Sequence, residues 1–311
     1  MKKLLYLLFL SLFAFTACEK EEEIIDFTAD KKAPKVEVCH YDATTDRWET
    51  IEINENAVKA HLNHGDFLGD CDRETYVPDD HFEYFLMYEG YDDSMDNSVL
   101  TKNITNIKIL DIPYDNPGAC GGPCSEISDI TGIEDFISLT DLSFGMVINT
   151  NFDFSFAPNL EKLRMREQEY LTYLDLSHNF SLSHLYISGA KNLTTLDLIN
   201  NTALLELNLE ISPLIVNITS LDLSNNTEIV KLILQSIPLS TLDLSNNTAL
   251  THLEIIPSPT MISLNLNNQN NQNLSYFYVS ESPNLTCFQV DDVVWSIANW
   301  TNYYTYSKNC Y

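Results

Sequence analysis

Leu239–Ala249 has the sequence LSTLDLSNNTA, and close copies of it recur through the second half of the chain. The copies are LTYLDLSHNFS, LTTLDLINNTA, ITSLDLSNNTE and the more divergent MISLNLNNQNN, at Leu171–Ser181, Leu193–Ala203, Ile218–Glu228 and Met261–Asn271. A phrase that returns every 20–50 residues or roughly so is typical of a solenoid. The Leu-x-Leu core alternates with period two, which predicts a short strand with both leucines facing inward.

A second, more varied half-unit of about 11 residues alternates with these copies. Rungs that consist of both half-units are expected to begin at spacings of 21, 22, 22, 25, 21 and 24 residues. Their first residues are Leu139, Leu160, Leu182, Leu204, Ile229, Leu250 and Leu274. The asparagines that end the constant half-unit are expected to stack and to bind backbone groups at the turns: Asn179, Asn201, Asn226 and Asn247.

The pattern LxxLxLxxN resembles the signature of leucine-rich repeats, and the segments around it are similar to bacterial surface lipoproteins of the Flavobacteria or Bacteroidetes type. The resemblance implies a mainly β fold, a right-handed leucine-rich-repeat solenoid with short parallel strands. It also implies a small helical cap at residues 74–103, repeats over 104–284 and a C-terminal cap at 285–311. In the first repeat, Ile107 and Ile109 are expected to take the inward leucine positions.

The N-terminus, MKKLLYLLFLSLFAFTAC, has two lysines, an apolar run and small residues before Cys18. This pattern is typical of a secretory signal over residues 1–17 and is too short for a transmembrane helix. The last four residues resemble a lipobox, with Phe15 in place of the usual leucine, which implies lipidation of Cys18. Residues 18–35 form an acidic tether, similar to an export tag for the outer face of the outer membrane. We therefore expect an outer membrane lipoprotein exposed at the cell surface.

Six cysteines remain once Cys18 is set aside, and an even number in an exported chain favours disulfides. Six cysteines allow 15 connectivities. We prefer local pairing, which places one bond in each of three segments. The pairs are Cys39–Cys71, Cys120–Cys124 and Cys287–Cys310.

Residues 36–73 are expected to form a disulfide-stapled mini-domain with a hairpin and a short helix that Asn54 caps and Gly65 ends. Its histidines could bind zinc together with Cys39 or Cys71. The candidates are His40, His61 and His64. The aspartates of the same segment would suit calcium: Asp66, Asp70 and Asp72. The simpler alternative, and our expectation, is a module that needs neither cofactor nor metal.

The two half-units predict different roles for the two faces of the solenoid. One outward position of the constant half-unit is Asp175, Asp197, Asp222, Asp243 or Asn265, and this sameness indicates a structural ladder. The outward positions of the other half-unit vary and include Arg, Tyr and His, which are typical of recognition surfaces. We therefore expect ligand binding at Lys162, Arg164, Arg166, His184, Tyr186, Glu206, Asn208, Lys231, His252, Glu254, Tyr276 and Tyr278. The alternative is that these side chains are ordinary solvent-exposed residues without a ligand. In that case Lys162, Arg164 and Arg166 form ion pairs with Glu161, Glu167 and Glu169.

The formal net charge is −28, which argues against nucleic-acid binding because that requires neutralisation of phosphates by Lys and Arg. No sequence motif for a catalytic triad, metalloprotease, P-loop or dinucleotide site is present. We expect a monomeric, non-enzymatic protein that binds a protein or glycan ligand and contacts the membrane through its N-terminal lipid. The alternatives are an envelope-adhesion role without a specific ligand, and a metal-dependent activity in residues 36–73.

Overall fold

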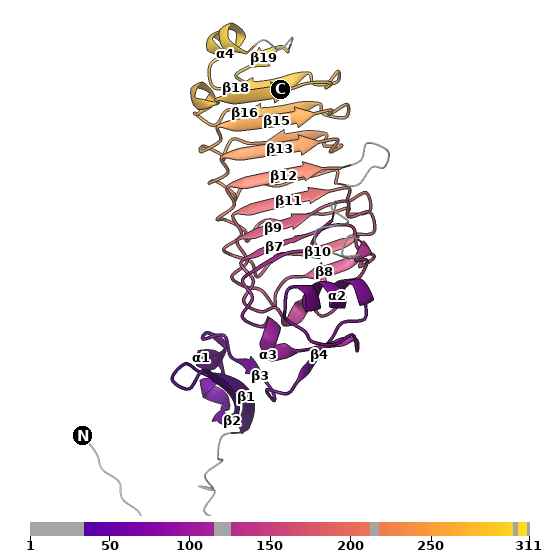
Figure 1. Ribbon diagram of the computed structural model, residues 1–311. Helices are drawn as coiled ribbons and strands as arrows, with labels where there is room; N and C mark the ends of the chain where they lie inside the picture. Colours follow the sequence, from indigo (N-terminus) through magenta and orange to yellow (C-terminus); the bar gives the residue numbers. More distant parts are fainter. Residues whose placement is uncertain (1–33, 115–125, 212–217, 301–303, 310–311) are drawn as a thin grey trace, which may run out of the picture. The chain divides into compact units, whose positions relative to one another are not determined.

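The computed structural model describes residues 34–114, 126–211, 218–300 and 304–309. Parallel strands from successive rungs stack along the repeat region, as Figure 1 shows from the magenta to the yellow part of the chain. Lys35–Tyr311 form one compact unit, which includes the N-terminal module, the cap and the repeats. The mainly β solenoid that the repeated phrase predicts is confirmed.

The varied half-units form a parallel sheet of eight strands. In spatial order these are β6 (Ile109–Asp111), β7 (Asp141–Phe144), β9 (Lys162–Met165), β11 (His184–Ser188), β12 (Glu206–Glu210), β13 (Lys231–Gln235), β15 (His252–Ile256) and β17 (Tyr276–Val279). Their alternating leucines face inward, and Leu185, Leu207 and Leu232 are each at most 2% exposed. We call the outward surface of these eight strands the long-sheet face.

The constant half-units lie on the other side of the core and form shorter strands. They are β8 (Asn151–Asp153) and β10 (Tyr173–Asp175) in one sheet, and β14 (Thr241–Asp243), β16 (Ser263–Leu266), β18 (Cys287–Val290) and β19 (Tyr306–Ser307) in another. The intervening copies at Leu193–Ala203 and Ile218–Glu228 follow the same path without assigned strands, yet Leu196, Leu198 and Leu223 are buried.

The predicted asparagine ladder is confirmed and joins the rungs on this side. The Asn226 side-chain amide donates to the carbonyl oxygens of Leu198 and Asn201, at 2.9 and 2.8 Å. Asn179, Asn201 and Asn247 bind the preceding rung in the same way. Each of these side chains is fully buried. The amide nitrogens therefore satisfy carbonyl groups that the turns would otherwise leave unpaired in the core.

The helical cap covers the first rungs. Helix α2 (Asp80–Tyr88) buries Phe82, Phe85 and Leu86. It is flanked by the antiparallel pair β4 (Glu74–Tyr76) and β5 (Ser98–Leu100), by α3 (Thr101–Ile104) and by the 3₁₀ turn η3 (Ile133–Asp135). In β6 the expected register is wrong, since Ile109 is 67% exposed while Leu110 and Ile112 are buried. Leu110 pairs with Leu142 of β7, and this pairing sets the register.

At the other end, η4 (Asn271–Asn273) precedes β17, and α4 (Val293–Asn299) follows β18. Trp300 is buried and stacks on Phe277, with ring centroids 4.1 Å apart, so the aromatic residues cover the last rung as expected. Val294 of α4, by contrast, is 78% exposed. Cys287 is disulfide-bonded, and its predicted partner Cys310 lies outside the described residues.

The N-terminal module contains a three-stranded antiparallel sheet of β2 (Arg47–Asn54), β1 (Lys35–Asp42) and β3 (Phe67–Leu68). A 3₁₀ turn η1 (Glu55–Ala57), capped by Asn54, leads into α1 (Val58–Leu62). The Cys39–Cys71 disulfide is confirmed. The predicted Cys120–Cys124 bond and the lipidation site Cys18 both fall outside the described residues.

Candidate functional site

The long-sheet face carries all twelve predicted binding residues except Arg166, which follows the end of β9. Parallel register places the first outward residues of successive strands beside one another. They form a row of Asp141, Lys162, His184, Glu206, Lys231, His252 and Tyr276. Two residues further along each strand lies a second row. It consists of Ser143, Arg164, Tyr186, Asn208, Ile233, Glu254 and Tyr278.

Most of the charged side chains in the first row form ion pairs with residues of a neighbouring strand. Lys162 contacts Asp141 at 2.9 Å, and Lys231 contacts Glu206 at 3.7 Å. Among the described residues, Lys162 thus pairs across strands with Asp141 and not with Glu161, Glu167 or Glu169, the partners of the alternative. The first row is an alternating-charge surface whose members already have partners within the chain.

Arg164 differs from the other cations of the face. It is exposed, and among the described residues it forms no ion pair. Its cross-strand neighbours are Ser143 and Tyr186. Arg166, by contrast, donates to the Ser143 hydroxyl at 2.9 Å. Arg164 is thus the guanidinium on this face that could bind an external carboxylate or carbonyl group without breaking an ion pair.

A hollow of about 300 Å³ lies over β6 to β13 and includes Arg164 in its lining. Tyr186 forms part of this lining, and its hydroxyl donates to Glu210 at 2.9 Å. Burial raises the pKa of Tyr186, and the bond to Glu210 acts in the same direction. The phenol is therefore a neutral hydrogen-bonding group at ordinary pH. The hollow is also lined by Lys162, His184, Glu206, Asn208 and Lys231.

The far end of the face is aromatic. His252 stacks on Tyr276 with ring centroids 4.2 Å apart and planes 10° apart. Tyr276 and Tyr278 are 42% and 44% exposed. Burial lowers the pKa of His252 below its ordinary value, which favours the neutral form of the stacked imidazole. Flat, partly exposed rings of this kind can pack against sugars or apolar side chains.

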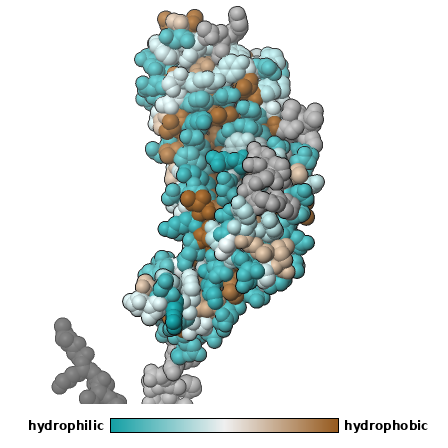
Figure 2. All heavy atoms as spheres, in the orientation of Figure 1, coloured by the Kyte–Doolittle hydropathy of each residue, from teal (hydrophilic) through white to brown (hydrophobic). Residues whose placement is uncertain are grey.

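The opposite side of the solenoid uses its polar residues for its own turns, as the sequence predicts. Asp175, Asp222 and Asp243 each accept a backbone N–H two residues further on, at 2.8 to 2.9 Å. Hydrogen bonds from Ser177 hold the pKa of Asp175 below its ordinary value, and those from Ser224 do the same for Asp222. These carboxylates are structural. Figure 2 shows the mostly hydrophilic surface of the repeats on the face in view.

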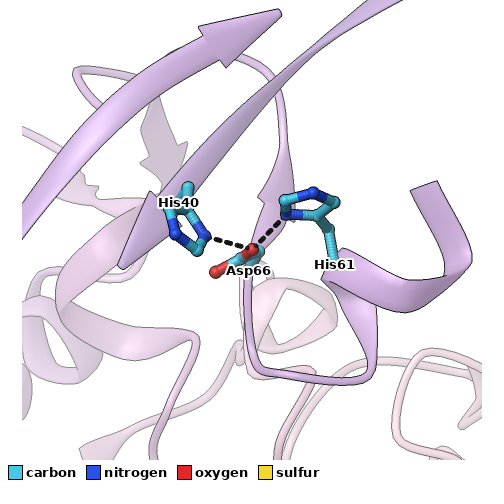
Figure 3. Close-up of side chains that lie close together, drawn as sticks. All are labelled: His40, His61 and Asp66. Carbon is cyan, nitrogen blue, oxygen red and sulfur yellow. Dashed lines mark hydrogen bonds and ion pairs between the residues drawn. The ribbon is translucent and has the colours of Figure 1, made fainter. Parts of the chain in front are cut away.

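The histidine cluster of the module differs in composition from the candidate zinc set. His40 of β1 and His61 of α1 both contact Asp66, each with 2.8 Å between Nδ1 and Oδ2, as Figure 3 shows. His64 is exposed and takes no part in the cluster, and Cys39 and Cys71 are joined in their disulfide. The zinc set that included His64 and a cysteine is therefore wrong. The sequence suggests Asp66 only as a calcium ligand, and nothing in the sequence alone brings it to His40.

The candidate calcium ligands do not converge either. Asp70 accepts from the Thr50 hydroxyl and the Asp72 N–H, while Asp72 contacts Lys102 at 3.4 Å. Within the described ranges, the group of His, Cys, Asp or Glu side chains with metal-binding spacing is His40, His61 and Asp66.

No known family model matches the chain, and neither does any curated protein. Among solved structures, the chain is similar to the functional domain of InlJ from Listeria monocytogenes, which includes a cysteine ladder. The identity is 19%, the match covers 70% of this chain and 64% of that one, and the TM-score is 0.24. It is also similar to the internalin InlF from Listeria monocytogenes, with 17% identity, 71% and 79% coverage and a TM-score of 0.37. The chain spans less than two thirds of the InlJ domain.

The repeat geometry described above is that of a leucine-rich-repeat solenoid, as the LxxLxLxxN pattern predicts. Across the described ranges, every helix is too short or too polar to cross a bilayer.

Proposed function

We propose that the protein is a non-catalytic binding protein and that the long-sheet face is its binding surface. The observation that supports this is the different use of outward polar residues on the two sides of the solenoid. On one side, aspartates such as Asp175 and Asp243 accept backbone N–H groups and are needed by the turns. On the long-sheet face, Arg164, Tyr276 and Tyr278 project outward with much of their surface exposed. Side chains that the fold does not use are free to be selected for a ligand.

The chemistry of the face favours a protein or glycan ligand. The hollow combines an unpaired guanidinium, a neutral phenol and the amide of Asn208, which suit carboxylate, hydroxyl and carbonyl groups. The stack of His252 and Tyr276 adds a flat apolar surface beside it. The alternating ion pairs of the first row make the face polar without a single dominant charge. We expect one partner molecule to span the hollow and the aromatic end.

The test is a screen of the purified protein against a glycan array and against extracellular proteins by pull-down. For any ligand found, Arg164→Ala and Tyr186→Ala should each weaken binding by about tenfold or more, as residues at the centre of an interface do. Tyr173→Ala is the matched control, because Tyr173 is 53% exposed on β10, on the other side of the solenoid. Equal affinity in all three variants would show that the ligand binds outside the long-sheet face. A screen without saturable binding would favour an adhesion role without a specific ligand.

We also propose that the protein is an outer membrane lipoprotein displayed at the cell surface. The support is the signal-like N-terminus that ends at Cys18 and the acidic residues that follow. Mass spectrometry of the mature N-terminus should find acyl chains on Cys18. Cys18→Ser should remove them and release the protein from the membrane fraction, whereas an unmodified Cys18 would contradict the anchor.

A further inference from the structure

The geometry points to a second site: we propose that His40, His61 and Asp66 bind a divalent transition-metal ion of the zinc class. One ring nitrogen from each histidine and one carboxylate oxygen of Asp66 all lie within 4.8 Å of one another, and each Nδ1 is 2.8 Å from Oδ2. The three side chains come from β1, α1 and the turn before β3, and point toward one another in Figure 3. This site lies in the module, apart from the long-sheet face, and does not depend on the function proposed for that face.

The donor set fits the metal. Neutral imidazole nitrogens and carboxylate oxygens are both zinc ligands, at about 2.0–2.2 Å. Ligands at that distance around a tetrahedral ion stand about 3.3 Å apart. Each Nδ1 now lies 2.8 Å from Oδ2, so an ion requires the donors to separate by about half an ångström. Small side-chain rotations are enough for this shift.

The carboxylate is held in place before any ion arrives. The Asp66 side chain is 2% exposed, and its Oδ1 accepts the backbone N–H of Tyr41 at 3.1 Å, which leaves Oδ2 aimed at the histidines. The Asp66 N–H donates to the carbonyl of His61 at 3.3 Å and ties the turn to the end of α1. The Cys39–Cys71 disulfide fixes the strand that carries His40. Such outer hydrogen bonds typically orient the ligands of metal sites.

Solvent can reach the centre of the cluster. The side chains of His40 and His61 are 34% and 22% exposed, while the carboxylate beneath them is buried. Three protein ligands with an accessible side leave a coordination position for water or an external ligand. The net charge of −28 also raises the local concentration of cations near the protein.

The competing explanation is a plain hydrogen-bonded cluster, in which each histidine donates an Nδ1–H to Asp66. The two explanations differ in proton position. In the metal complex both Nδ1 lone pairs bind the ion, so each neutral imidazole must carry its single proton on Nε2. Binding to neutral histidines therefore changes the tautomer of both rings without releasing a proton. The ¹⁵N chemical shifts of the two rings distinguish these states.

The experiment is titration of the full chain, stripped with EDTA, with Zn²⁺ in a calorimeter. We expect one ion per chain and a shift of both imidazoles to the Nε2–H tautomer. His61→Ala and His40→Ala should each weaken binding by more than the roughly 10- to 100-fold that loss of a supporting hydrogen bond costs a metal site. His64→Ala is the matched control, because His64 follows the same helix but is exposed and outside the cluster. It should bind Zn²⁺ as the wild type does.

Folding of each variant is checked by circular dichroism and by retention of the Cys39–Cys71 disulfide. Because His40 and His61 are partly exposed, at least one of their alanine variants is expected to fold. Co²⁺ provides a second measurement, since a site with two nitrogens and one oxygen should give visible absorption bands that His61→Ala removes. No Zn²⁺ binding by the wild type, or binding that His64→Ala reduces as much as His61→Ala does, would overturn the proposal.

Discussion

The side-chain amide of Asn226 lies 2.8 Å from the carbonyl oxygen of Asn201, although 25 residues separate the two asparagines. The contact repeats at each step of the ladder, with Asn201 on Asn179 and Asn247 on Asn226. Among the described residues, the Asn226 Oδ1 has no hydrogen-bond partner, so the contribution of this side chain comes from its NH₂ group. The ladder therefore depends on a donor at this position.

Asn226→Asp tests that dependence with almost no change in shape. The carboxylate would face two carbonyl oxygens in a buried position, so we expect a loss of about 3–5 kcal/mol in the free energy of unfolding. Asn225→Asp makes the same chemical change at the preceding, exposed residue, whose amide donates to the carbonyl of Ile199 at 3.3 Å, and should cost about 1 kcal/mol or less. Denaturation by urea measures both. Similar losses in the two variants would contradict a structural role for the buried amide.

The second prediction concerns Asp79, which joins the helical cap to the first complete rung. Its Oδ1 accepts the N–H groups of His81 and Phe82 at the start of α2, and its Oδ2 accepts the N–H and hydroxyl of Ser128. Asp79→Ala should lower the free energy of unfolding by about 2–3 kcal/mol, because a helix cap and buried N–H groups lose their acceptor. Asp80→Ala, at an exposed position in the same turn, is the control.

Asp79 also gives a pH dependence whose sign follows from its pKa. Burial alone would raise the pKa of Asp79, but the hydrogen bonds from Ser128, Phe82 and Asp129 outweigh it and hold the pKa below its ordinary value. The stabilisation is therefore complete above the unfolded pKa of about 3.9 and is lost as the pH falls through the lower folded pKa. The difference in stability between wild type and Asp79→Asn should shrink across that acidic range. A difference that is constant with pH would contradict this account.

The Cys39–Cys71 disulfide gives a third prediction. It closes a loop with a sequence separation of 32 residues. Loop-closure entropy predicts that Cys39→Ser with Cys71→Ser destabilises the N-terminal module by about 3–4 kcal/mol. Hydrogen exchange should show faster exchange in β1 and β3, with β12 and β13 of the repeats unchanged as the internal control. Equal loss of protection in the repeats would show that the module and solenoid unfold together.

The repeated phrase predicts the solenoid, the asparagine ladder and the division between a constant and a varied side, because each depends on the spacing of residues within one rung. Contacts between rungs do not follow from the spacing within one rung. Ile107 and Ile109 alternate as regularly as Leu110 and Ile112, and pairing with Leu142 selects the second pair. Likewise, the sequence contains His40 and Asp66 at a separation of 26 residues, and only the folded module brings them together. The residues proposed to bind a ligand lie on one surface, but no sequence pattern identifies that ligand.

A fourth prediction concerns Gly189, in the turn after β11, which has a φ of +70°. A Cβ at this position would lie 2.7 Å from the Cα of Glu167 in the preceding rung, closer than real contacts allow. The Gly189 N–H donates to the carbonyl of Glu210 in the next rung, so the backbone cannot move away without losing that bond. Gly189→Ala should therefore combine the strain of a left-handed backbone with a steric clash, at a total cost of about 3 kcal/mol in the free energy of unfolding.

Gly90→Ala separates these two contributions. Gly90 has a φ of +81°, but a Cβ there would find no atom within 4 Å. Gly90→Ala should therefore lower the free energy of unfolding only by the cost of a left-handed backbone, about 1–2 kcal/mol. Urea denaturation of the two variants measures the difference, which reports the close contact between adjacent rungs. If Gly90→Ala proves as damaging as Gly189→Ala, the spacing of the rungs at Glu167 does not require glycine, and the turn after β11 could accept a side chain.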